Sequence, residues 1–273
     1  MTARKFHFIS GLPRSGSTLL AAILNQNPRF CAGMTSPLAD IMGVVMAEAS
    51  SKNDFAFSVS DDQRASMLRG LVENFYAGPA GADVVFDTSR LWCSRMKLLE
   101  ALFPQAKVIA CVRQLSWVLD SMERLVRASP VNVSKVFRFD TNTTVYARVE
   151  ALTDPRGMVG FAFQSVKDAF YGQYAPGQLL LLTYESLVSD PAKTLRAFYQ
   201  FIGEPWFEHD FDNIEYNANE FDERVGMPGL HTVRRKLEVI DRTSILPPEV
   251  FNRFSREAFW LDPKNNIGRV NVL

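Results

Sequence analysis

One stretch near the start of the chain carries the strongest structural signal: Phe6-His7-Phe8-Ile9-Ser10-Gly11-Leu12-Pro13-Arg14-Ser15-Gly16-Ser17-Thr18. It joins an apolar run, Phe6 to Ser10, to a helical pattern from Ser15 to Asn25. A glycine-framed turn between a strand and a helix points unpaired N–H groups and the positive end of the helix dipole at one place, which favours a bound phosphate. We therefore predict a phosphate-binding loop at residues 11–18, to which Ser17 and Thr18 add hydroxyl donors.

The same alternation of a short apolar run and a longer helical pattern recurs along the chain. The further pairs are Asp83 to Asp87 with Trp92 to Leu102, Lys107 to Arg113 with Leu115 to Arg127, and Gln178 to Thr183 with Pro191 to Ile202. These runs are apolar on both faces, as parallel strands covered by helices on each side must be. The pattern predicts an α/β fold in which a P-loop-like parallel sheet is flanked by helices on both faces, with ligands outside the carboxyl ends of the strands.

Chain organisation is expected to be simple. A length of 273 residues without internal repeats or a long linker predicts a single domain over residues 1–273. The helix from Pro191 to Ile202 has clear boundaries, because Asp190 can cap its start and Gly203 can end it. Residues 213–246 show weak periodicity and clustered charge, so we expect a long loop that partly covers the site.

Composition excludes several classes of protein. Lys and Arg number 30, as do Asp and Glu, which argues against a polybasic nucleic-acid binder and makes any anion site local. No apolar run approaches the roughly 18 residues that a membrane span needs, and the first residues do not resemble a signal peptide, so we expect a cytoplasmic protein. The cysteines Cys31, Cys93 and Cys111 are too widely spaced for a disulfide ladder or a Cys-based metal site.

The predicted loop differs from the common nucleoside-triphosphate loop, G-x-x-x-x-G-K-[ST], at one informative position. Both glycines and Thr18 are present, but Ser17 stands where that motif has lysine. The lysine serves the β- and γ-phosphates of ATP or GTP, so its absence, with Arg14 inside the loop, disfavours a small-molecule kinase or other phosphotransferase. That class remains an alternative.

The run from Phe8 to Leu20 resembles the 5′-phosphosulfate loop of sulfotransferases that use 3′-phosphoadenosine-5′-phosphosulfate (PAPS). Its Pro-Arg-Ser-Gly-Ser-Thr form is similar to the loop of tyrosylprotein and bacterial sulfotransferases, more than to the lysine-bearing cytosolic type. The resemblance implies transfer of a sulfuryl group to a hydroxyl or amine without a metal ion, leaving adenosine 3′,5′-bisphosphate. It implies that the donor's 5′-phosphosulfate is held by Arg14, Ser15, Gly16, Ser17 and Thr18, with Arg14 also stabilising the departing charge.

Further segments support the resemblance. In the family, an arginine at a strand end and a serine eight residues later bind the 3′-phosphate of the donor, and Arg113 and Ser121 have that spacing. The run Thr183-Tyr184-Glu185-Ser186-Leu187 is similar to a family pattern that implies Tyr184 near the adenine. Sulfotransferases commonly complete the donor site with a basic C-terminal loop, for which the candidates are Arg234, Arg235 and Lys236.

The general base is not assigned by the resemblance. The glutamate of tyrosylprotein sulfotransferases corresponds to Thr35, and the histidine that cytosolic enzymes use after a middle strand is missing from residues 86–90. That segment offers Asp87 as a possible base and Arg90 as a substitute cation. We favour His231, beside the basic cluster, with Asp87 and Asp40 as rivals; His7 and His209 are interpreted as structural.

Besides the kinase, two hypotheses about the function therefore remain. The first is a sulfotransferase acting on a small-molecule, glycan or peptide acceptor, with no nucleic-acid partner. The second is a non-catalytic nucleotide-binding module, which the missing carboxylate at Thr35 encourages. The acceptor pocket is expected in loops 36–60, 128–160 and 207–246, which carry no recognisable motif for one acceptor class.

Overall fold

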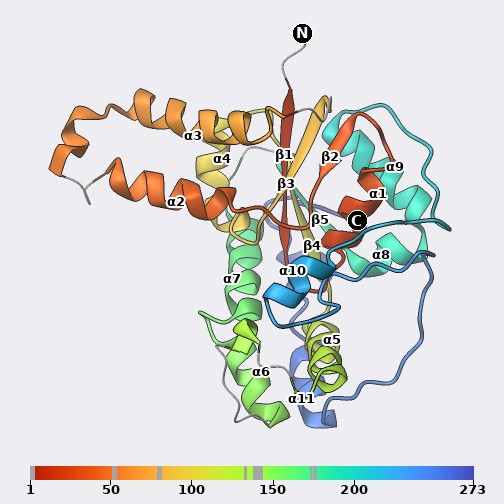
Figure 1. Ribbon diagram of the computed structural model, residues 1–273. Helices are drawn as coiled ribbons and strands as arrows, with labels where there is room; N and C mark the ends of the chain where they lie inside the picture. Colours follow the sequence, from red (N-terminus) through yellow and green to blue (C-terminus); the bar gives the residue numbers. More distant parts are fainter. Residues whose placement is uncertain are drawn as a thin grey trace.

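A computed structural model describes residues 4–50, 54–78, 82–131, 134–137, 144–172, 174 and 177–273. Its centre is a six-stranded sheet, all parallel, in the order β2-β3-β1-β4-β5-β6 (Figure 1). The strands are β1 (Lys5–Gly11), β2 (Phe30–Ala32), β3 (Val84–Thr88), β4 (Val108–Val112), β5 (Leu179–Thr183) and β6 (Asn271–Val272). The predicted parallel sheet is confirmed.

Helices lie on both faces of the sheet (Figure 1). The α-helices are α1 (Ser17–Leu24), α2 (Leu38–Glu48), α3 (Asp61–Phe75), α4 (Met96–Leu102), α5 (Leu115–Ala128), α6 (Val145–Thr153), α7 (Met158–Tyr171), α8 (Tyr184–Ser189), α9 (Pro191–Ile202), α10 (Asn219–Arg224) and α11 (Pro248–Ser255). Within the described residues, no helix is both long and apolar enough to cross a lipid bilayer.

The sheet separates two hydrophobic cores because strand side chains alternate between its faces. In β1, Phe8 packs into the core that α4, α5 and α7 also line. Ile9, its neighbour, packs into the core lined by α1 and α9. The central strands are therefore buried on both sides, which is why their sequences are apolar throughout.

All the predicted strands and their following helices are present, with ends that shift by a residue or two. The pattern from Trp92 to Leu102 begins as a 3-10 turn, Cys93–Arg95, and continues as α4. Helix α9 has the predicted bounds: the Asp190 side chain accepts a hydrogen bond from the Lys193 N–H, and Gly203 ends the helix with φ 69°.

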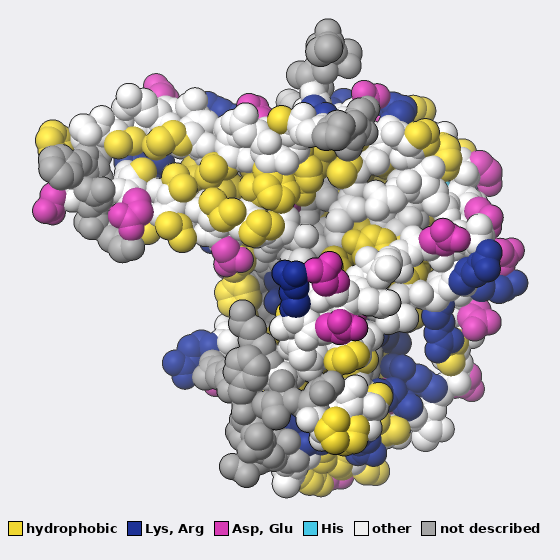
Figure 2. Space-filling view, in the orientation of Figure 1, with side chains coloured by type: hydrophobic (Ala, Val, Ile, Leu, Met, Phe, Trp, Pro, Cys, Tyr) yellow, Lys and Arg dark blue, Asp and Glu magenta, His cyan; other side chains and the backbone are white. Residues whose placement is uncertain are grey.

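The expected long loop at residues 213–246 lines part of the pocket, but it also contains a short helix, α10, that was not predicted. Backbone hydrogen bonds also pair its two arms: the Ile214 N–H donates to the Arg235 oxygen at 2.7 Å, and the Leu237 N–H donates to the Phe211 oxygen at 2.9 Å. Helices α2 and α3 were not predicted; they form an arm that projects from the sheet (Figure 1), and hydrophobic side chains gather along it in Figure 2.

Candidate functional site

A large pocket opens at the carboxyl ends of β1, β3 and β4, where the fold predicts ligands. Its volume is about 1710 Å³, well above the roughly 300–1,000 Å³ of most single-ligand pockets. Residues from the turn after β1, the end of β3, α5, α8 and the segment 230–242 line it. The space suffices for two substrates side by side.

Loop 11–18 is held in a shape that glycine makes possible. Gly11 has φ 114°, and a Cβ there would lie 2.0 Å from the Cys111 oxygen. Gly16 precedes α1 with φ 95° and has no side chain that could cap the helix. The first N–H groups of α1 therefore remain available to donate hydrogen bonds to a ligand. These amides and the helix dipole favour an anion at the start of α1.

Substituting Gly11 tests this close approach of two strands. Gly11→Ala is expected to lower the free energy of unfolding by about 2–5 kcal/mol, from left-handed strain plus overpacking. Gly203→Ala is the matched control, since Gly203 also has a positive φ but nothing within 4 Å of its Cβ position. Urea unfolding should show a clearly smaller loss for the control; equal losses would contradict a tight β1–β4 contact.

The hydroxyls of the loop divide into two kinds. Ser15 is buried, and its hydroxyl lies within donating distance of two carbonyl oxygens, those of Leu12 at 2.5 Å and Cys111 at 2.8 Å. Ser17 and Thr18 line the pocket. Ser15 therefore fixes the loop with its side chain, leaving Ser17 and Thr18 as the hydroxyls that face a ligand.

Arg14 lines the pocket and has φ 59°, uncommon for a residue with a side chain. Its Nε donates to the Ser121 hydroxyl at 3.0 Å, and its Nη1 donates to the Leu230 oxygen. Burial, followed by the charge of Arg113, lowers the Arg14 pKa to about 10, so the guanidinium stays charged at neutral pH. Arg14 thus links the loop to α5 and to the segment before His231.

Arg113 follows β4 and stacks on the first residue of α8. Its guanidinium carbon lies 4.0 Å from the centre of the Tyr184 ring. Its Nε is buried without a hydrogen-bond partner, and the nearest carboxylate oxygen, on Glu185, is 3.7 Å away. A buried guanidinium with an unused donor is suited to an anionic ligand.

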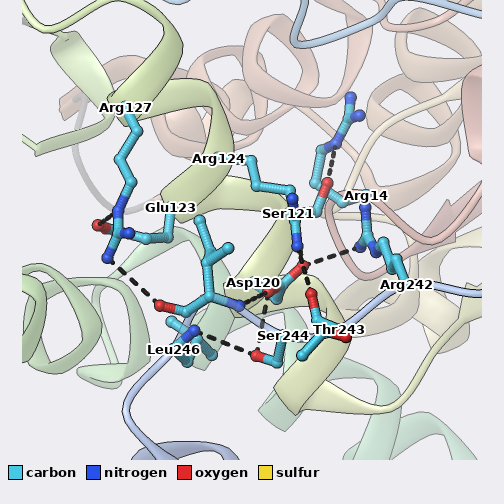
Figure 3. A network of polar contacts seen from close by, with 11 residues as sticks. Arg14, Asp120, Ser121, Glu123, Arg124, Arg127, Arg242, Thr243, Ser244 and Leu246 are labelled. Carbon is cyan, nitrogen blue, oxygen red and sulfur yellow. Dashed lines mark hydrogen bonds and ion pairs between the residues drawn. The ribbon is translucent and has the colours of Figure 1, made fainter.

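A third arginine, Arg242, completes this cluster and was not predicted. The charges of Arg113 and Arg242 lower the pKa of Arg14, and the charge of Arg242 lowers the pKa of Arg113, so the three guanidinium groups lie close together. The Arg242 Nη2 lies 3.2 Å from Asp120, whose carboxylate is fully buried in α5 (Figure 3). We name Arg14, Arg113 and Arg242 the arginine cluster.

Asp120 anchors the segment that carries Arg242. Its carboxylate also accepts hydrogen bonds from the Ser244 hydroxyl at 3.0 Å, the Ile245 N–H at 2.8 Å and the Arg124 Nε at 2.9 Å (Figure 3). Despite the opposing effect of burial, these donors hold the Asp120 pKa below its usual value. The charged carboxylate thereby fixes Arg242 at the edge of the pocket, next to the Ser121 side of α5.

The predicted basic cluster is only partly in the pocket. Arg234 and Lys236 line it, but they pair with Glu238 at 3.4 Å and Asp212 at 2.8 Å. Arg235 is not among the lining residues; it is exposed and donates to the Asn213 side chain at 2.7 Å. The basic contribution of this segment to the buried end of the pocket thus comes from Arg242.

His231 is half-buried and pairs with the buried Asp222 of α10. Its Nδ1 lies 2.5 Å from Asp222 Oδ1, and its backbone N–H donates to Oδ2 at 2.8 Å. Burial lowers the His231 pKa below 6.5; Asp222 raises it, while Arg14 and Arg90 lower it further. A neutral ring whose Nδ1–H is given to Asp222 has Nε2 free to accept a proton in the pocket.

The rival bases lie in different surroundings. Asp87 is fully buried and does not line the pocket; its oxygens accept hydrogen bonds from Tyr76 at 2.7 Å and Trp92 at 2.8 Å, and burial raises its pKa. Asp40 and Arg90 line the pocket, as does Thr35. This geometry favours His231 over Asp87 as a proton acceptor.

The other two histidines have structural surroundings. His7 Nδ1 accepts a hydrogen bond from the Lys107 N–H, and His209 bonds to the Tyr199 hydroxyl. Burial lowers both pKa values to about 4. Among the described residues, no group of three or more His, Cys, Asp or Glu could hold a metal ion.

Comparison with known proteins gives the same family as the resemblance of the loop at residues 8–20. The family model described as "Sulfotransferase family" matches residues 7–208. A Caenorhabditis briggsae relative, "Putative protein-tyrosine sulfotransferase", is 24% identical over 204 residues, covering 71% of this chain and 64% of the relative. The chain therefore spans less than two thirds of that relative's length.

Two solved structures share the fold. The sulfotransferase domain from the curacin biosynthetic pathway superposes with a TM-score of 0.58 at 17% identity, covering 92% of this chain and 96% of that domain. The sulfotransferase domain of the Synechococcus PCC 7002 olefin synthase gives a TM-score of 0.53 at 21% identity, with 96% and 97% covered.

Proposed function

The chain belongs to the sulfotransferase family, and from this we propose that it moves a sulfuryl group from PAPS to a hydroxyl or amine of an acceptor, leaving adenosine 3′,5′-bisphosphate. One observation carries the proposal: the arginine cluster lies beside a glycine-framed helix start. Within the described residues, Arg14 has no carboxylate at ion-pair distance. Excess buried positive charge of this kind favours a polyanionic ligand.

The residues fit the two anionic ends of the donor. Loop 11–18 and Arg14 would hold the 5′-phosphosulfate, because amides without a cap, hydroxyls and a guanidinium converge there. Arg113 and Arg242 would hold the 3′-phosphate, since Arg113 Nε is buried without a hydrogen bond. Tyr184 would lie by the adenine, supported by its place in the pocket wall.

The chain's own residues would handle the proton and the developing charge. His231 Nε2 would accept the proton of the acceptor hydroxyl as its oxygen bonds to sulfur, while the bond from sulfur to the bridging phosphate oxygen breaks. Asp222 would hold the ring in the tautomer with Nε2 free. Arg14 and the α1 amides would stabilise the negative charge left on the phosphate.

The direct test compares ligands by calorimetry and follows a labelled sulfuryl group. Adenosine 3′,5′-bisphosphate is expected to bind, and ATP with magnesium is expected to bind weakly or not at all. Labelled PAPS should pass its label to members of an acceptor panel. Strong uptake of magnesium ATP with indifference to the bisphosphate would favour a phosphotransferase, and tight PAPS binding without transfer or hydrolysis would favour a binding module.

Arg113→Ala is expected to weaken donor binding. Losing one charge-assisted contact costs about 1.5–3 kcal/mol, so the bisphosphate Kd should rise roughly 10- to 150-fold. The maximal rate should change little, because at the 3′-phosphate the contact would lie far from the reacting atoms. Calorimetry and saturation kinetics measure both, with Arg196→Ala in α9 as control; a lower maximal rate at unchanged donor affinity would contradict the assignment.

A further inference from the structure

We propose that the acceptor is an alcohol with a large apolar body, held in a hydrophobic chamber that forms the other half of the pocket. The inference rests on the proposed function and specifies its substrate class. We name this part the acceptor chamber. Its apolar walls are Leu91, Val136, Phe137, Met158, Phe161, Phe221, Val225 and Leu230.

The walls come from segments that are far apart in sequence and share one core. Leu91 follows β3, Met158 and Phe161 begin α7, and Phe221 lies in α10. Leu91, Val136, Met158 and Val225 all pack against the same buried core cluster. Val136 and Val225 are further joined through Ser134, whose hydroxyl donates to the Val225 oxygen. The chamber is therefore backed by packed side chains rather than by a surface loop alone.

Charged groups on the α6–α7 side of the pocket take part in ion pairs. Glu150 lies 2.7 Å from Arg253, and Asp154 lies 3.7 Å from Arg156. Both pairs are largely exposed to solvent, so Met158 and Phe161 supply the apolar contact on this side of the pocket. A glycan or an acidic peptide would bring polar groups that this wall cannot satisfy, which costs affinity.

Charges at the inner end of the chamber belong to the catalytic side. Arg90 acts on His231 and lowers its pKa, and Asp40 in turn acts on Arg90. Arg90 therefore lies near the proposed proton acceptor, with Asp40 near Arg90. We expect the polar function of the acceptor, its reacting hydroxyl, at that end of the chamber.

The chamber opens directly on the proposed base. The Phe221 and His231 ring centres are 5.4 Å apart, and Leu230 precedes His231 while its carbonyl accepts a hydrogen bond from Arg14. A molecule whose apolar body lies against Phe221 would place a terminal hydroxyl between His231 and Arg14. The same residues thus connect apolar recognition with the reacting group.

A homologous series of primary alcohols tests the chamber. Each added methylene that leaves water should raise kcat/KM about fourfold until the chamber is filled. Glucosamine and a tyrosine peptide should react far more slowly than the longest fitting alcohol. A flat dependence on chain length, or preference for the sugar or the peptide, would overturn the inference.

Variants of two chamber residues test whether the dependence on alcohol chain length arises in the acceptor chamber. Phe161→Gln and Met158→Gln should each lower kcat/KM for the longest alcohol at least tenfold, with little change for the shortest. Ile267→Gln, at an exposed position outside the pocket, is the matched control. If both wall variants keep the wild-type chain-length dependence, the acceptor does not occupy this chamber.

Binding measurements separate this inference from the proposed function. Calorimetry of the long alcohol with the bisphosphate present should give a Kd that both wall variants raise. Failure of the bisphosphate itself to bind would overturn the proposed function. Normal bisphosphate binding without any affinity for the alcohols would overturn the acceptor chamber alone.

Discussion

Arg14→Ala is expected to lower the maximal rate of sulfuryl transfer by about 100- to 1,000-fold. Removing one preorganised donor from a site of developing charge typically costs about 3–4 kcal/mol of transition-state stabilisation. Arg14 is the cluster member in the loop itself, held against Ser121 and the Leu230 carbonyl. In the proposed mechanism its charge would lie where the departing phosphate oxygen becomes negative, and single-turnover kinetics with labelled PAPS measures the loss.

Two further variants sharpen the interpretation of this loss. Arg14→Lys keeps a positive charge but not the planar contact with both partners, so it should recover only part of the rate. Arg256→Ala, at an exposed arginine outside the pocket, should leave the rate unchanged. An Arg14→Ala protein that keeps its maximal rate and loses only donor affinity would place Arg14 at the non-reacting end.

Local signals explain why so much of the fold was predictable. The turn after β1 is specified by Gly11 and Gly16, whose positive φ values other residues rarely adopt. Helix α9 is specified by Asp190, Pro191 and Gly203 within one continuous segment. Such elements need no distant partner, so sequence periodicity and end signals suffice.

Elements that depend on distant partners were not predicted. Strands β2 and β6 contain only 3 and 2 residues, too few for a recognisable pattern, and exist because a neighbouring strand pairs with them. Asp222 and Arg242 likewise stand in no motif. They join the site because α10 and the segment after it fold back over α5, which sequence spacing does not encode.

On the acceptor side of the pocket, too, some residues could be predicted from the sequence and others could not. Thr35 was expected in the site by position and does line the pocket, although it brings no carboxylate. The acceptor loops 36–60 and 128–160 fall partly outside the described residues, at 51–53, 132–133 and 138–143. Apolar residues such as Phe161 look like ordinary core positions in the sequence, and only their shared exposure to one pocket distinguishes them.

His231→Ala is expected to lower kcat by about 100- to 10,000-fold, the usual contribution of a general base. His231 must be neutral to accept a proton, and burial lowers its pKa below 6.5. The rate of the unmodified enzyme should therefore rise with pH, with a midpoint below the ordinary histidine pKa of about 6.5, and level off roughly one pH unit above that midpoint. A pH–rate profile of kcat/KM measures the rising limb, which His231→Ala should remove.

The Asp222→Asn variant tests whether Asp222 positions the His231 ring for catalysis or only contributes to stability. Asp222 raises the pKa of His231, so its neutral replacement should move the rising limb to still lower pH. The plateau should fall as well, because an amide no longer favours the tautomer with Nε2 free. A purely structural role for Asp222 would lower stability without moving the limb. Asp40→Asn is the competing test: if it removes the limb while His231→Ala retains it, the base is Asp40.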